Sequence, residues 1–198
     1  MKDYLKTFIG AISAGIAIAI GGLAFLITSA PWVFTIGLLM VCYLGLSLFT
    51  GKISYISSFK EFPKLMLIWV GNIIGAFILG IIAYHIRPDI IERARELTAA
   101  KLNEGWLLLP KAILCNVMIF AAVHGWKNLP TPLDGVAVIF ATAIFVICGF
   151  EHCIANVFYF SASGQFSVPM IQYIIVNTLF NMLGGILAYR VTKYIQGD

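Results

Sequence analysis

The sequence contains few charged residues. Asp, Glu, Lys and Arg make up 11% of its 198 residues, whereas soluble domains carry about 25%. Hydrophobic residues make up 61%, and the mean hydropathy is +0.95. A chain with this balance has too little polar surface for a soluble globule. We therefore predict an integral membrane protein.

Basic clusters and paired cysteines are also missing. The net charge of +4 is modest and no basic block stands out, so we expect no nucleic-acid partner. The four cysteines lie in apolar runs without CxxC spacing. We interpret them as buried thiols rather than as a metal site or a disulfide framework, and we expect no metal and no cofactor.

Long apolar runs dominate the chain. A membrane-spanning helix needs about 20 mostly apolar residues. The candidate spans cover about residues 6–28, 32–56, 64–86, 106–126, 134–160 and 168–190. The first run is longer than the apolar core of a cleavable signal peptide, about 7–15 residues, so we interpret it as a span. The sequence thus predicts one all-α transmembrane domain over residues 1–198, with interruptions in the second and fifth spans.

One strongly charged stretch, about residues 88–105, separates the third span from the fourth. We expect it to be a solvated connector. With the N-terminus inside, eight Lys and Arg residues face the cytoplasm and four, all in the connector region, face outside. Because the side with more basic residues stays in the cytoplasm, we predict that both termini are cytoplasmic.

The two interrupted spans resemble one another. An offset of 104 residues aligns Gly45 with Gly149, and in each span an apolar stretch and a possible helix break follow. The third and sixth spans share an Asn-x-x-Gly element, at Asn72 and Asn181, which we interpret as joining helices or holding loops. Three spans repeated after an odd number of crossings must be inverted. We therefore predict two inverted three-helix repeats, about residues 1–87 and 106–198, with broken second and fifth helices.

The fifth span contains a Glu-His pair. Glu151 and His152 lie in the apolar run 136–159, which carries no other charge. A charged side chain at membrane depth costs about 2.5–3.5 kcal/mol on insertion scales, so such groups face a bundle interior or a pathway. Gly149 precedes the pair, and broken helices at this depth are tolerated where they are buried or line a cavity. The segment is therefore a candidate functional site; a buried structural histidine is the alternative.

Three segments resemble a known family. They read Leu-Gly-Leu-Ser-Leu-Phe-Thr-Gly at 44–51, Lys-Ala-Ile-Leu-Cys-Asn at 111–116, and Gly-Phe-Glu-His-Cys-Ile-Ala-Asn at 149–156. In this order they resemble the signature segments of the formate/nitrite transporter family. The resemblance implies an aquaporin-like fold and a homopentamer with one pore per protomer. It also implies passage of small monovalent anions such as formate, nitrite or hydrosulfide, across the bilayer of a cell membrane, the bacterial inner membrane.

The same resemblance implies a substrate pathway. His152 matches the central pore histidine, and the other pathway positions are Phe34, Leu38, Leu48, Thr50, Asn116, Phe145 and Asn156. Of these, Phe34, Leu38 and Phe145 fall where the family builds apolar constrictions. The chain departs from the family pattern at two positions. Ser47 replaces a residue that is often acidic, and Lys52 replaces one that is often Asn.

The physical chemistry suits an anion path. Stripping water from an anion is costly, and an imidazole with a pKa of about 6.5 can donate a hydrogen bond or a proton. We expect His152 to act on the anion and Glu151 to point away, satisfying backbone donors of the broken helix. Lys111 either raises the anion concentration at a pore entrance or extends toward the membrane surface.

Two other function classes remain open at this point. One is an aquaporin-like channel for a small neutral solute. The other is a membrane enzyme that uses Glu151, His152 and a thiol, although the sequence offers no second cluster at metal-ligand spacing and no nucleophile-base-acid set.

Overall fold

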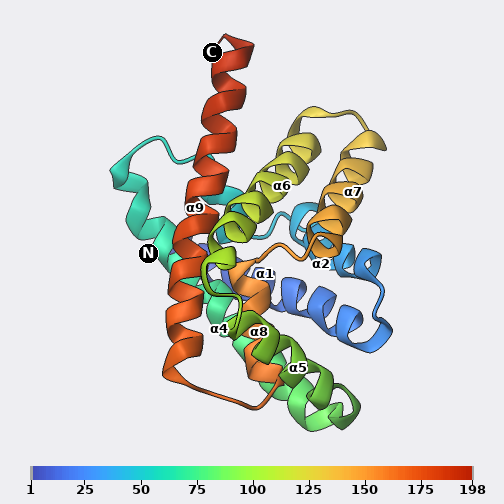
Figure 1. Ribbon diagram of the computed structural model, residues 1–198. Coiled ribbons are helices and arrows are strands. Elements are labelled where there is room, and N and C mark those ends of the chain that lie inside the picture. Colours follow the sequence, from blue (N-terminus) through green and yellow to red (C-terminus); the bar gives the residue numbers. More distant parts are fainter. Residues whose placement is uncertain (1, 198) are drawn as a thin grey trace.

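The computed structural model describes residues 2–197, and every regular element in this range is a helix (Figure 1). Four helices are long and apolar enough to cross a membrane: α1 (Lys2–Thr28), α4 (Phe62–Ile86), α6 (Leu108–Asn128) and α9 (Val168–Gln196). The shorter helices are α2 (Thr35–Tyr43), α3 (Phe49–Ile53), α5 (Ile91–Leu102), α7 (Leu133–Ile147) and α8 (Cys153–Ala162). Single 3-10 turns cover Pro31–Phe34, Phe59–Glu61, Pro88–Ile90 and Gly105–Leu107. The predicted all-α membrane fold is confirmed.

Both predicted interruptions are present, and both have the same backbone geometry. Gly45 ends α2 and Gly149 ends α7, each with a φ of 64°, in the left-handed region that glycine adopts without a steric penalty. The residue after each glycine donates its N–H five residues back, Leu46 to the Val41 carbonyl and Phe150 to that of Phe145. This is the Schellman pattern of helix termination.

The chain also restarts its helices in the same way. Leu48 precedes α3 with φ −97° and ψ 127°, and His152 precedes α8 with φ −99° and ψ 117°. The first N–H of α3 donates to Asn72 Oδ1 (2.8 Å), and the first N–H of α8 donates to Asn181 Oδ1 (2.9 Å). Each break is therefore fixed by an asparagine from a long helix.

The amide nitrogens of these asparagines complete the pattern. Asn72 Nδ2 donates to the carbonyls of Ala11 (2.7 Å) and Ser47 (2.9 Å). Asn181 Nδ2 donates to Ala112 (2.7 Å) and Glu151 (2.9 Å). The asparagines thus join helices and hold loops, as the sequence predicted.

Glycine three residues after each asparagine lets the long helices approach closely. A Cβ on Gly75 would lie 2.1 Å from the Ile12 carbonyl oxygen, and a Cβ on Gly184 would lie 2.1 Å from that of Ile113. No side chain fits in either place, so α4 packs directly on α1 and α9 directly on α6.

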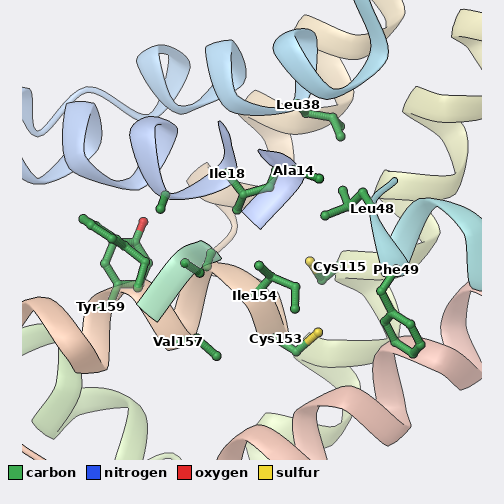
Figure 2. Packing of buried hydrophobic residues seen from close by; sticks show 14 of the residues in the cluster. Ala14, Ile18, Leu38, Leu48, Phe49, Cys115, Cys153, Ile154, Val157 and Tyr159 are labelled. Carbon is green, nitrogen blue, oxygen red and sulfur yellow. The ribbon is translucent and has the colours of Figure 1, made fainter. Parts of the chain in front are cut away.

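The short helices α3 and α8, which follow the two breaks, each pack against long helices from the other half of the chain. α3 packs against α6 and α9, whereas α8 packs against α1 and α4. Figure 2 shows buried side chains of α1, α2, α3, α6 and α8 meeting in one core. The two breaks consequently lie within the bundle rather than at its edge.

The connector differs from the prediction. Its helix α5 lies beside α8 at one end of the bundle, opposite the end at which α9 projects (Figure 1). Ala94 and Thr98 are buried, and Arg93 Nη1 donates to the Leu26 carbonyl (2.8 Å). The solvated connector was therefore a wrong expectation for one face of α5, because this face packs on the bundle.

The cysteines differ in burial. Cys115 and Cys153 are buried as predicted, Cys42 is half-buried, and Cys148 is exposed at the end of α7. The buried-thiol interpretation is wrong for Cys148, since this residue lies where the helix breaks.

Candidate functional site

His152 connects the two helix breaks through its ring nitrogens. Nδ1 accepts a hydrogen bond from the Ala155 N–H (3.2 Å), and Nε2 lies 2.9 Å from Thr50 Oγ1 in α3. A backbone N–H can only donate, so the proton of the neutral ring sits on Nε2 and is donated to Thr50. The Thr50 hydroxyl hydrogen remains free to be donated to another acceptor.

Two phenyl rings cover the imidazole. The Phe145 ring stacks on His152 with centroids 6.0 Å apart and an interplanar angle of 27°. Phe34 meets Phe145 edge to face at 5.4 Å. All three side chains are at most 3% exposed. Apolar rings therefore flank the imidazole.

A cavity of about 110 Å³ lies beside these rings, toward the α5 end of the bundle. Its walls include five of the ten predicted site residues: Phe34, Phe145, Glu151, His152 and Asn156. Lys101 of α5 also lines it. We name this space the Lys101 cavity.

The remaining predicted pathway residues lie toward α2 and α3. Leu38 and Leu48 are 0% and 2% exposed, and Figure 2 shows them with Ile18 of α1 in the buried core. Asn116 Nδ2 donates to the Thr50 carbonyl (3.2 Å), which fixes α3 from α6. Asn116 Oδ1 has no hydrogen-bond partner within residues 2–197.

Glu151 forms a buried ion pair. Its carboxylate oxygens lie 2.6 and 2.8 Å from Lys101 Nζ, and Asn156 Nδ2 donates to it at 2.7 Å. The side chains of Glu151 and Lys101 are 3% and 12% exposed. The expectation that Glu151 satisfies backbone donors is wrong, because an ammonium and a side-chain amide bind its carboxylate instead.

Lys101 is the site residue that sequence reasoning missed. It lies in the charged connector, and neither its spacing nor its neighbours distinguish it from the exposed charges around it. Only the docking of α5 on α8 brings Lys101 to Glu151.

A second ion pair lies next to the first. Lys111 Nζ contacts Glu104 Oε1 at 2.7 Å, and the Tyr173 hydroxyl donates to Glu104 Oε2 at 3.3 Å. Burial raises the pKa of Glu104 above its ordinary value, while the hydrogen bond from Lys111 opposes this shift. The charge of Lys111 is therefore compensated by Glu104.

Comparison with known proteins identifies the family of this chain. The family model described as "Formate/nitrite transporter" matches residues 1–195. The formate channel FocA of Haemophilus influenzae is 28% identical over 187 residues, which cover 79% of this chain and 66% of FocA. The alignment thus spans just under two thirds of that relative.

Two solved structures share the fold. A pentameric formate channel with formate bound matches with a TM-score of 0.88 and 22% identity, over 98% of this chain and 97% of the other. An ion channel of the FNT family matches with a TM-score of 0.90 and 19% identity, over 97% and 90% of the two chains. The family consists of transporters and not of enzymes, and because its model covers nearly the whole sequence, the chain belongs to the formate/nitrite transporter family.

Proposed function

We propose that the protein is a transmembrane channel for small monovalent anions, or for their weak acids, of the formate, nitrite and hydrosulfide class. The observation that carries this proposal is the buried hydrogen bond between His152 Nε2 and Thr50 Oγ1 (2.9 Å). It joins two adjacent polar groups, one from each broken helix, next to the apolar rings of Phe34 and Phe145. The family membership and the anion named for the relative with a known structure point the same way.

The proposed path crosses two apolar constrictions. Phe34 and Phe145, which line the Lys101 cavity beside His152, form the first constriction, and Leu38 and Leu48 form the second. An anion loses its water at such a constriction, which is costly unless hydrogen-bond donors replace that water. The Thr50 hydroxyl can donate one hydrogen bond to the anion. Because His152 donates to the Thr50 oxygen, the Thr50 hydroxyl becomes a stronger donor.

Protonation of the imidazole is tied to the local fold. A second proton must bind Nδ1, and that nitrogen already accepts the Ala155 N–H. The imidazolium can therefore form only if the first turn of α8 gives up this hydrogen bond. An anion that stays near His152 offsets that loss, which couples anion binding to protonation.

The proposed architecture has six crossings in two inverted halves, as in aquaporins. The first half is α1, α2 with α3, and α4; the second is α6, α7 with α8, and α9. The matched breaks and asparagine contacts support this equivalence. Both termini then lie on one side, and the excess of Lys and Arg assigns that side to the cytoplasm of a bacterial inner membrane.

Cysteine labelling tests this orientation. A Lys60→Cys variant with Cys148 replaced by Ser should react with an impermeant reagent only from the cytoplasmic face. Reaction only from the outside contradicts the topology.

We further propose a homopentamer in which each protomer contains its own path. The structure of the pentameric relative supports this assembly. The exposed apolar side chains of α7 and α9, including Phe140, Ile171 and Leu179, supply surface for neighbouring protomers and lipid.

Flux into liposomes tests the function. Formate, nitrite and hydrosulfide should enter faster than glycerol. Thr50→Val should lower anion flux about tenfold because it removes a buried hydrogen-bonding group, while Thr50→Ser should keep most of it. Glycerol passage without anion passage would instead support the neutral-solute channel.

A further inference from the structure

The repeat allows the two breaks to be compared position by position. The 104-residue offset pairs Ser47 with Glu151 and Lys52 with Asn156. The contacts support this pairing, since Asn72 Nδ2 donates to the Ser47 carbonyl and Asn181 Nδ2 donates to that of Glu151. The two breaks have the same backbone and different charges.

At the α8 break the charges cancel. Glu151 neutralises Lys101, and Asn156 donates to the same carboxylate. At the α3 break, position 47 offers a hydroxyl in place of a carboxylate, and position 52 offers an ammonium in place of an amide. The charge balance at the α3 break is therefore positive.

Lys52 lines a second cavity, of about 350 Å³, which we name the Lys52 cavity. Ser47 and Lys127 also line it, together with Thr7, Tyr55, Glu61, Lys64, Leu65 and Ile68. Neither Lys52 nor Lys127 forms an ion pair within residues 2–197. The ammonium groups of Lys52 and Lys127 thus both line the Lys52 cavity.

The other charges of this cavity cancel only one of them. Lys64 is paired with Asp3 at 3.1 Å, whereas the Glu61 carboxylate keeps its negative charge while it accepts a hydrogen bond from Ser57 Oγ at 2.6 Å, so one net positive charge remains. Lys127 Nζ lies 3.6 Å from the centroid of the Tyr55 ring. This contact positions the ammonium without neutralising it, because a ring face carries no net charge.

We propose that Ser47, Lys52 and Lys127 form an anion site for halides and small oxyanions at one entrance of the path, with no equivalent at the Lys101 cavity. One unit charge about 7 Å away in water raises the local anion concentration about threefold. The site therefore concentrates the substrates of the proposed function on the Lys52 side. Conduction should consequently saturate at a lower concentration from this side than from the other. This last consequence rests on the proposed function.

A binding measurement tests the site without transport. The probe is chloride, followed by ³⁵Cl NMR line broadening with the protein in lipid nanodiscs, and formate should reverse the broadening. Lys52→Asn, which installs the side chain found at position 156, should at least halve the excess broadening, as should Lys127→Gln. Lys60→Gln, an exposed lysine outside the cavity, should leave it unchanged.

The repeat supplies a second, reciprocal variant. Ser47→Glu copies the carboxylate of Glu151 and should reduce chloride binding as Lys52→Asn does, and by more than Ser47→Gln, which adds no charge. Wild-type broadening in both Lys52→Asn and Ser47→Glu overturns the site.

Conductance across an oriented bilayer tests the asymmetry. Lys52→Asn should raise the half-saturating formate concentration about threefold from the Lys52 side and leave it unchanged from the other. Equal changes from both sides overturn the asymmetry. If wild-type protein conducts no anion but Lys52→Asn still loses chloride binding, the proposed function fails and the binding site stands.

Discussion

Removing one partner of the buried Lys101–Glu151 pair should strongly destabilise the fold. Lys101→Met keeps the length of the side chain and removes its charge. The Glu151 carboxylate, 3% exposed, is then left with the Asn156 amide as its remaining side-chain donor within residues 2–197. Leaving one charge of a buried pair without its partner costs about 3–5 kcal/mol. We expect Lys101→Met to lower the free energy of unfolding by this amount.

A double variant separates the cost of leaving one charge unpaired from the cost of removing the whole ion pair. In Lys101→Met with Glu151→Gln, neither charge remains, and the glutamine oxygen can still accept from Asn156. Replacing both partners of a buried pair is often close to neutral, so the double variant should lose less than the two single variants added together.

Unfolding by SDS in mixed micelles provides the measurement. The control is Lys64→Gln, which breaks an ion pair whose side chains are 46% and 76% exposed. It should cost about 0–1 kcal/mol. Our reasoning is refuted if Lys101→Met costs no more than this control, or if the losses of the single variants simply add.

Three further predictions follow from the packing and assembly. Leu48→Ala should raise anion flux and relax selectivity, because it widens an apolar constriction; an unchanged flux profile in liposomes means that Leu48 is ordinary core packing. Gly184→Ala should reduce the yield of folded protein in size-exclusion chromatography, because its Cβ would lie 2.1 Å from the Ile113 oxygen, whereas Gly135→Ala, with no atom within 4 Å, should not. Equal yields contradict the close approach of α9 and α6. Native mass measurement in mild detergent and in lipid should give five chains, and a monomer or dimer in both contradicts the proposed assembly.

The spans and their breaks were predictable because their causes are local. Apolar length determines a span, and a glycine followed by a polar or turn-prone segment determines a break. The observed φ of 64° at both Gly45 and Gly149 confirms that the two aligned glycines end their helices in the same backbone conformation.

The charge pairing was not predictable because it depends on tertiary contacts. Lys101 reaches Glu151 only after the whole connector has packed back on α8, and no spacing in the sequence encodes that contact. The tautomer of His152 could not be predicted for the same reason, since it depends on hydrogen bonds to the Ala155 N–H and to Thr50 of the other half. The departures at Ser47 and Lys52 were visible in the sequence, but their unbalanced charge was not.

The central claim is that His152 acts on the anion. The most direct measurement is anion uptake into liposomes over about pH 5 to 8, the range in which a histidine can titrate, for wild type and His152→Asn. Both proteins must be present in equal amount and equal assembly state. Asparagine keeps a hydrogen-bond donor and cannot titrate, so the proposed mechanism predicts that the shape of the pH profile changes and not merely its height. Two profiles that superimpose after scaling would show that His152 is structural and would contradict the mechanism.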